Sequence, residues 1–124
     1  MNIALWVVQG ILAVAFLIAG GTKLALSNQR LLERGPAMAW VGDFSQRSVK
    51  TIGTLEVLGA LSLVIPPALD FATVLTPTAA TGFVLLMFGA TIVHLRRGET
   101  VAIGLPILLG VLALVVVFLR ALAL

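Results

Sequence analysis

Four apolar runs alternate with short polar segments along the chain. They occupy residues 3–26, 50–65, 71–95 and 101–122. About 20 apolar residues in a helix cross the hydrocarbon core of a bilayer, and backbone groups in lipid must find their hydrogen-bond partners within the protein. The pattern therefore predicts an all-α fold, a transmembrane four-helix bundle formed by a single domain over residues 1–124.

In the second and third runs, prolines bear on where the helices end and begin. Pro66 and Pro67 directly follow the second run and are expected to end that helix, because proline lacks the backbone N–H. Pro77 leaves the start of the third helix open. Either Thr76 caps a helix with Pro77 at its first position, or a longer helix begins near Leu69 and kinks at Pro77.

Residues 27–49 form the one substantial loop. It carries charged side chains on both sides of Gly35 and Pro36, and it includes the aromatic residues Trp40 and Phe44. A tryptophan between charged residues and a membrane span is typical of the membrane–water boundary. Two interpretations stay open: a segment that lies on the bilayer, and a lid over the end of the bundle.

Composition places the chain among membrane proteins and excludes several kinds of site. Of its 124 residues, 60% are hydrophobic and 10% charged, and the mean hydropathy is +1.18. Such a chain cannot cover itself with polar surface as a soluble domain does. It has no cysteine, which excludes disulfides, thiolate metal sites and CxxC redox chemistry. We expect no metal site, and any electron would need a bound carrier.

The basic residues indicate an orientation in the membrane. The formal net charge is +3, but the chain has no basic block or aromatic-interleaved motif of the kind that binds nucleic acid, so we expect no nucleic-acid partner. The loop at residues 27–49 and the turn after the third helix lie on the same side of the membrane. That side carries seven cations, and the opposite side carries only Arg120. The seven are Lys23, Arg30, Arg34, Arg47, Lys50, Arg96 and Arg97. The positive-inside rule then predicts an inner (plasma) membrane protein with both termini outside and residues 27–49 in the cytoplasm.

One ionisable side chain, Glu56, lies well inside the second run. On a helix it shares a stripe with the small residues Gly53, Gly59 and Ala60, which let another helix approach closely. A carboxyl group in apolar surroundings either finds a donor or stays protonated, and within a membrane it indicates function. We therefore expect helix packing at these three small residues, with the carboxyl group between helices.

Lys23 and His94 fall at the same depth as Glu56. Lys23 lies a turn from the end of the first helix, His94 lies at the end of the third, and Glu56 is about 9 Å inward from Lys50 at the helical rise. These three residues are the candidate ligand-binding or buried polar cluster. The alternative is that they only hold a small bundle together, with Lys23 and His94 reaching the headgroups. No nucleophile with an adjacent base is evident, so we name no catalytic residue.

Glycines also recur on the third helix. Gly82 and Gly89 are seven residues apart and share a face, a spacing that suits close helix packing. Because a bundle this small cannot use every glycine stripe internally, we expect contact with another membrane protein or with a second copy of the chain. Glycines that face lipid are the alternative.

In order along the chain, these elements resemble the DoxX-like family of small four-helix membrane proteins. The resemblance covers nearly the whole chain and rests on residues 20–24 (GGTKL), 50–60 (KTIGTLEVLGA) with Pro66 after them, and 89–99 (GATIVHLRRGE). It implies a four-helix bundle with Lys23, Glu56 and His94 at recurring polar positions. It links the family to a subunit of a quinone-linked oxidoreductase and to partners of redox enzymes.

Two kinds of function follow as expectations. The first is a non-catalytic accessory, anchor or assembly subunit of a membrane complex, because small residues abound and a catalytic constellation is missing. The second is a component of a redox system that binds a quinone or another lipophilic ligand, with Glu56 or His94 hydrogen-bonded to a quinone oxygen. On its own the chain is not expected to be an enzyme; any enzymatic role would belong to a quinone-linked oxidoreductase complex. It has no expected intrinsic cofactor, and its surroundings are membrane lipids.

Overall fold

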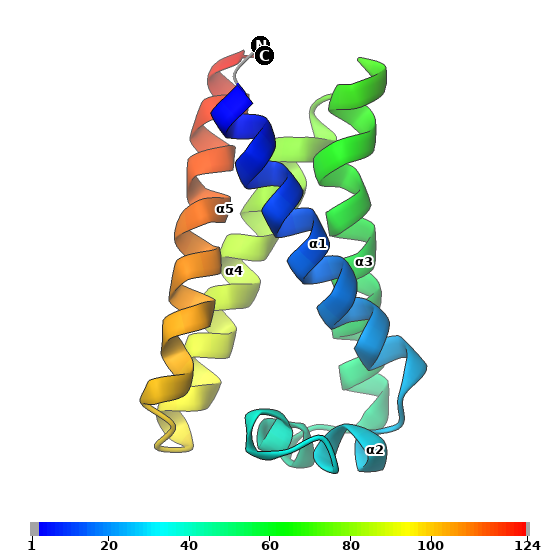
Figure 1. Ribbon diagram of the computed structural model, residues 1–124, viewed down its shortest axis with the longest axis vertical. Helices are drawn as coiled ribbons and strands as arrows, with labels where there is room; N and C mark the ends of the chain where they lie inside the picture. Colours follow the sequence, from blue (N-terminus) through cyan, green and yellow to red (C-terminus); the bar gives the residue numbers. More distant parts are fainter. Residues whose placement is uncertain (1–2, 124) are drawn as a thin grey trace.

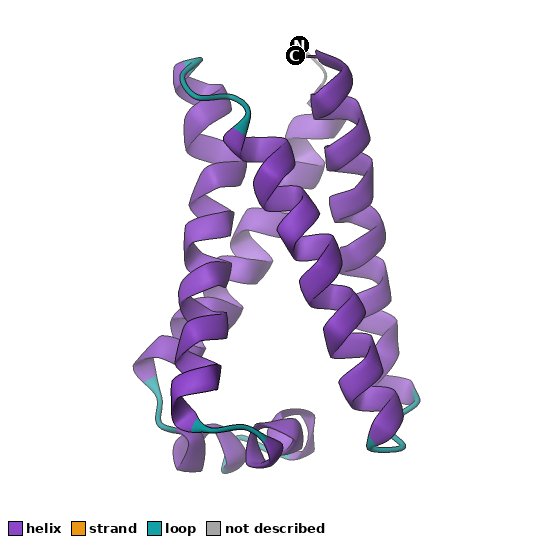
Figure 2. Ribbon diagram, turned by 180° about the vertical axis from the view of Figure 1, so that it is seen from behind, coloured by secondary structure: helices purple, strands orange, loops and turns teal. Residues whose placement is uncertain are grey.

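Four long helices form the molecule in the computed structural model, which describes residues 3–123 (Figure 1). The long helices are α1 (Ile3–Ala25), α3 (Gln46–Leu69), α4 (Leu75–Arg96) and α5 (Gly104–Ala123); the shorter elements are α2 (Asn28–Leu32), η1 (Pro36–Asp43) and η2 (Val101–Ile103). Within these residues there is no strand (Figure 2). The four candidate spans, the last counted from Val101, are long and apolar enough to cross a membrane, so the predicted all-α transmembrane bundle is confirmed.

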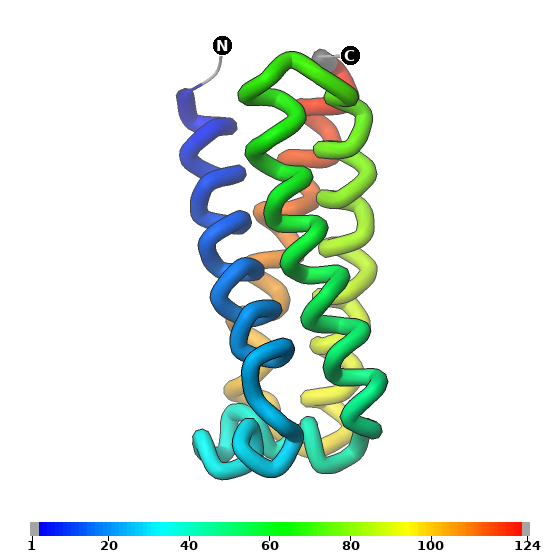
Figure 3. Tube along the Cα trace, turned by 90° about the vertical axis from the view of Figure 1, so that its right-hand side faces the viewer, coloured from blue at the N-terminus to red at the C-terminus, as the bar shows by residue number. Residues whose placement is uncertain are grey.

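The segment between α1 and α3 and the turn between α4 and α5 lie at one end of the bundle, and the chain termini and the turn between α3 and α4 lie at the other (Figure 3). We call these the loop end and the terminal end. The pair formed by α1 and α3 and the pair formed by α4 and α5 diverge toward the loop end, and α2 and η1 lie across that end (Figures 1 and 2). The backbones of the two helix pairs are therefore farthest apart at the loop end, where α2 and η1 lie across them.

Glycines allow the closest approaches between helices. A Cβ on Gly20 of α1 would lie 2.6 Å from the carbonyl oxygen of Gly53 on α3, so neither backbone could approach as it does with a larger residue. On α3, a Cβ on Gly59 would lie 2.5 Å from the ring of Phe83, which stacks on Phe16 with centroids 3.8 Å apart. Gly59 thus leaves room for an aromatic pair that joins α1 to α4 in the core.

α3 extends beyond its expected range at both ends. Its first turn begins at Gln46, where the Ser45 side chain accepts a hydrogen bond from the Ser48 N–H and caps the helix. At its other end the helix does not stop before Pro66 and Pro67, as the prolines suggested, but continues to Leu69. Each proline leaves one carbonyl four residues earlier without its usual donor.

Side chains from neighbouring helices replace the two missing donors. The Thr76 hydroxyl donates to the Ser62 carbonyl at 2.7 Å, and the Gln9 amide donates to the Leu63 carbonyl at 2.6 Å. Both side chains are buried, so the helix continues through the prolines because its freed carbonyls find partners from α1 and α4.

α4 begins later than residue 71, the expected start. Its first residue is Leu75, and Pro77 lies within the first turn, where helical N–H groups lack a partner in any case. The helix therefore needs no kink at Pro77. Thr76 does not cap the helix, because its hydroxyl is directed to α3.

At the loop end, residues 27–45 fold over a small core of their own. Leu31, Val41 and Val49 are fully buried there. Lys50 joins this segment to α1, since its ammonium group donates to the carbonyls of Lys23 and Leu24 at 2.6 and 3.0 Å and also to that of Leu26. Those carbonyls end α1 and have no partner within the helix, so the lysine caps α1 from another helix.

Candidate functional site

A cavity of about 470 Å³ lies between the helices in the half of the bundle nearest the loop end. All four long helices and η1 contribute to its wall, which is mostly apolar. The charged or titratable side chains on that wall are Lys23, Glu56 and His94. The sequence predicted that these three residues lie at the same depth. In the structure they line one cavity, each from a different helix.

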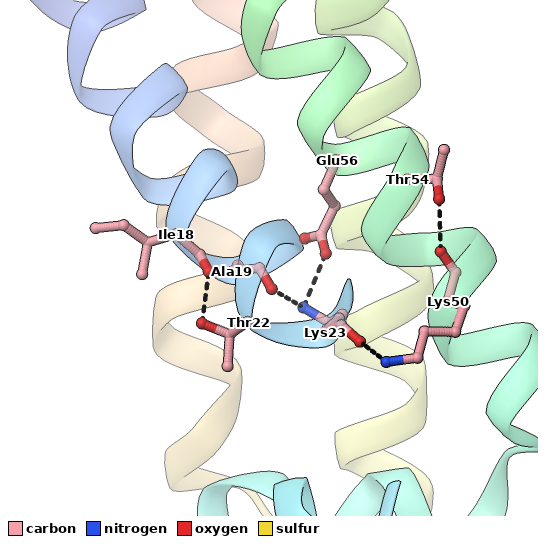
Figure 4. Close-up of polar contacts among 7 residues, drawn as sticks. All are labelled: Ile18, Ala19, Thr22, Lys23, Lys50, Thr54 and Glu56. Carbon is pink, nitrogen blue, oxygen red and sulfur yellow. Dashed lines mark hydrogen bonds and ion pairs between the residues drawn. The ribbon is translucent and has the colours of Figure 1, made fainter. Parts of the chain in front are cut away.

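Lys23 and Glu56 form an ion pair across α1 and α3 (Figure 4). The Lys23 Nζ atom lies 2.8 Å from the Glu56 Oε1 atom, and 11% of the lysine side chain and 3% of the glutamate side chain are exposed. The approach of Gly20 to Gly53 one turn away brings the two helices close enough for the pair. Lys23 therefore does not extend to the headgroups, and its charge is offset inside the bundle.

The ion pair does not use the full hydrogen-bonding capacity of the carboxylate, even at Oε1, the oxygen that faces Lys23. Glu56 Oε1 is buried, and no described residue donates a well-aligned hydrogen bond to it. A buried acceptor without a full set of donors is costly unless a further partner approaches. Because Glu56 lines the cavity, such a partner would come from a bound molecule.

Trp40 and Phe44 bring the loop segment into the cavity wall. Their rings pack edge to face with centroids 5.6 Å apart, and the Lys23 ammonium lies 5.8 Å from the centre of the Trp40 ring. A cation at this distance from an indole face is attracted to it. This segment thus lies across the loop end of the cavity, the position that the lid interpretation expects, and we call it the lid.

His94 lines the cavity but pairs away from Lys23 and Glu56. Its Nδ1 atom lies 2.8 Å from Glu99 Oε1, in the turn between α4 and η2. Arg97 Nε lies 3.4 Å from the same oxygen, and the Arg97 guanidinium also donates to Asp43 at the end of η1. The turn therefore connects the histidine to the lid. Lys23, Glu56 and His94 thus share one cavity, as expected, but only Lys23 and Glu56 are in contact with each other.

These contacts alter the acidity of the turn. The hydrogen bond with His94, followed by the contacts with Arg97, lowers the pKa of Glu99 below its usual value. Contacts with Asp43 and then Glu99 raise the pKa of Arg97. Both groups are thus charged at neutral pH.

The small residues expected to pack helices fall into two groups. Gly53 and Gly59 lie in tight contacts with α1 and α4, and Ala60 is buried. Gly82 and Gly89 make no close helix contact within the chain, because no atom lies within 4 Å of the position of a Cβ on either. Both border open space instead: Gly89 lines the main cavity, and Gly82 lines a second groove of about 530 Å³ between α3 and α4.

A second polar group, at the terminal end, was not anticipated. Gln9 bonds the Leu63 carbonyl and accepts from the Arg120 guanidinium, which also lies 5.1 Å from the ring of Trp6. The signal in the sequence was a glutamine inside an apolar span together with a proline pair in another. Through the bond to Leu63, Gln9 stabilises α3 next to its two prolines.

Chemically, the cavity can bind and orient a molecule. It offers an ammonium group, a carboxylate and an imidazole in apolar surroundings, which suits hydrogen bonding to a lipophile with a polar head. Among the residues described, no group of three or more His, Cys, Asp or Glu side chains could hold a metal ion.

Comparison with known proteins gives one match. The model of the DoxX-like family matches residues 7–116, a stretch that includes Lys23, Glu56 and His94. No curated protein and no solved structure matches the chain.

Proposed function

The chain belongs to the DoxX-like family, and from this premise we propose that it binds a lipophilic ligand of the quinone type in its loop-end cavity. It would do so as a non-catalytic accessory component of a redox system in the inner (plasma) membrane. The electron chemistry would belong to a partner enzyme, and this chain would hold and orient the ligand.

The observation that supports the proposal best is the composition of the cavity wall. An apolar cavity of about 470 Å³ has the size of a small-molecule site. Its buried Lys23–Glu56 pair can donate through the ammonium group to a carbonyl oxygen, as in a quinone, and accept through the carboxylate from a hydroxyl group, as in its reduced form. A bundle that needed only packing would be expected to fill this space with side chains.

Tryptophan fluorescence provides a direct test. The chain has two tryptophans, so Trp6→Phe leaves Trp40, on the cavity wall, as the sole emitter. A short-chain benzoquinone added to this variant in detergent is expected to quench Trp40 saturably. Glu56→Gln should abolish the saturable part while the protein remains assembled, because the Lys23 ammonium, the donor to a quinone oxygen, loses the carboxylate that holds it at the cavity wall.

A filled cavity gives the matched control. Gly89 borders the cavity, and no atom lies within 4 Å of the position of a Cβ on it, so Gly89→Leu is expected to add a side chain to the cavity. Gly21 is equally free of neighbours but does not line the cavity. Saturable quenching should disappear in Gly89→Leu and persist in Gly21→Leu; linear quenching in all variants would reject the proposal.

A second candidate, an anchor or assembly subunit, is favoured by the groove between α3 and α4. Gly82 and Ala79 line it, and no atom of the chain lies within 4 Å of the position of a Cβ on Gly82. A helix of a partner membrane protein or of a second copy would fit such a surface. Gly82→Leu should then release a protein that otherwise co-purifies, and unchanged co-purification would count against this candidate.

We also propose that residues 27–49 are cytoplasmic and both termini lie outside. Seven of the eight cations at the loop side support this orientation. The natural chain has no cysteine, so single cysteines introduced at position 2 or 35 report their own accessibility. Position 2 should react with an impermeant reagent in intact cells, and position 35 only after permeabilisation; the reverse pattern would invert the topology.

A further inference from the structure

The histidine on the cavity wall offers a bound molecule an acceptor, in addition to the ammonium and carboxylate groups of Lys23 and Glu56. His94 bonds Glu99 through Nδ1. Glu99 is held ionised by its neighbours, which lower its pKa, and an ionised carboxylate can only accept. The proton in this contact therefore belongs to Nδ1. In the neutral ring the other nitrogen, Nε2, then carries a lone pair and acts as an acceptor.

Nε2 is the atom of His94 that remains for a bound molecule. It makes no hydrogen bond with any residue in the described part of the chain, and His94 lies on the cavity wall. Across the cavity, Glu56 Oε1 is a second buried acceptor; the Lys23 ammonium lies 2.8 Å from it, and no described residue completes a regular hydrogen bond to it. The wall of the cavity thus has an unfilled acceptor on α4, His94 Nε2, and a carboxylate on α3 whose one close partner is the Lys23 ammonium.

From this arrangement we infer that the cavity selects lipophiles that carry a hydroxyl group, and that His94 Nε2 accepts the hydroxyl proton in a hydrogen bond. Glu99 acts as a positioning residue that fixes the tautomer of the ring. The inference rests on the proposed ligand-binding function and narrows it: among molecules of equal shape, those with an O–H donor bind more tightly than those whose oxygen only accepts.

An equimolar mixture of two probes tests this selectivity. 4-Nonylphenol and its methyl ether differ only in that a methyl group replaces the hydroxyl hydrogen, so that the oxygen of the ether can accept but not donate. The mixture is added to the purified full chain in detergent, the protein is desalted, and the retained probes are quantified by mass spectrometry, with Gly89→Leu as the blank for uptake by the micelle. One hydrogen bond of ordinary net strength gives an expected excess of phenol over ether of about 5-fold.

Three variants assign the selectivity to the histidine. His94→Phe keeps a ring but removes the acceptor, and the excess should fall to about 1-fold. Glu99→Gln can donate to Nδ1 through its amide, which moves the ring proton to Nε2 and turns the acceptor into a donor, so the excess should fall there as well. Asp43→Asn weakens the contact between lid and turn without touching His94, and it should keep the wild-type ratio.

The outcomes separate the two proposals. Equal retention of phenol and ether by the wild type, both above the blank, would overturn the selectivity and leave the ligand-binding function standing. Retention of neither probe above the blank would overturn both. A wild-type excess that survives in both His94→Phe and Glu99→Gln would overturn the role of His94. Should His94→Phe fail to fold, Glu99→Gln alone decides, because the total probe retained reports whether its cavity is intact.

Discussion

Lys23 and Glu56 place opposite charges 2.8 Å apart inside a largely apolar part of the molecule. Neither charge would be stable there alone, because desolvation of an unpaired ion costs far more than a surface contact returns. Each residue therefore depends on the other, and the pair depends on the glycines that bring its helices together. At this scale, the site is a property of two helices and not of one.

Replacing one member of the pair should destabilise the protein more than the sum rule predicts from the double variant, because a single replacement leaves a buried charge without its partner. Lys23→Met or Glu56→Met alone should lower the free energy of unfolding by about 3–5 kcal/mol, since each leaves an uncompensated buried charge. The double variant should lose clearly less than the sum. Unfolding in detergent, followed by circular dichroism, measures all three. Additive losses would show that the two side chains do not interact.

Helix contacts in this bundle depend on glycine at particular positions. Gly20 and Gly21 are adjacent in sequence, yet a Cβ on Gly20 would lie 2.6 Å from a backbone oxygen of α3, whereas one on Gly21 would meet no atom within 4 Å. A side chain can turn aside from such a contact, but a backbone carbonyl within a helix cannot. The two positions therefore form a matched pair for testing the α1–α3 contact.

Gly20→Ala should destabilise the protein by about 1–3 kcal/mol, the usual cost of forcing extra atoms into a packed contact. Gly21→Ala should cause no loss, because alanine favours the helix and the space is open. Thermal unfolding in the same detergent compares them. If both variants unfold at the same temperature, α1 and α3 do not approach at Gly20.

The proline pair in α3 makes a second prediction about helices. Gln9→Met removes the donor to the Leu63 carbonyl and should cost about 1–3 kcal/mol, the penalty for a buried acceptor without a partner. Pro67→Ala restores a backbone N–H four residues after Leu63. The cost of Gln9→Met should therefore be smaller in the Pro67→Ala background, as a double-mutant cycle measures. An equal cost in both backgrounds would mean that Gln9 does not serve that carbonyl.

For the whole molecule, hydropathy was sufficient to predict the four spans and the class of fold. Depth along the helices also placed Lys23, Glu56 and His94 in the same half of the bundle. The pairing was not predictable, because whether a lysine reaches Glu56 or the headgroups depends on how closely α1 and α3 approach. His94 illustrates the same point, since its partner Glu99 lies in a turn whose conformation hydropathy does not determine.

The ends of the helices were harder to predict than their number. Proline is expected to end a helix because the carbonyls that it frees usually have no donor. Here the donors come from α1 and α4, which are far away in sequence. The same holds for the lid: its aromatic residues suggested the membrane boundary, but their place on the cavity wall follows from the divergence of the two helix pairs. Tertiary contacts decide both cases.

The central claim is that the loop-end cavity is a ligand site, and the most direct measurement is the amount of lipophile that leaves the membrane with the protein. Wild type, Gly89→Leu and Gly21→Leu would be purified at native expression in a mild detergent, extracted, and analysed by mass spectrometry for small lipophiles per chain. We predict about one molecule of a single polar-headed lipophile per chain in the wild type and in Gly21→Leu, and close to none in Gly89→Leu. Equal amounts of the same lipids in all three proteins would contradict the claim.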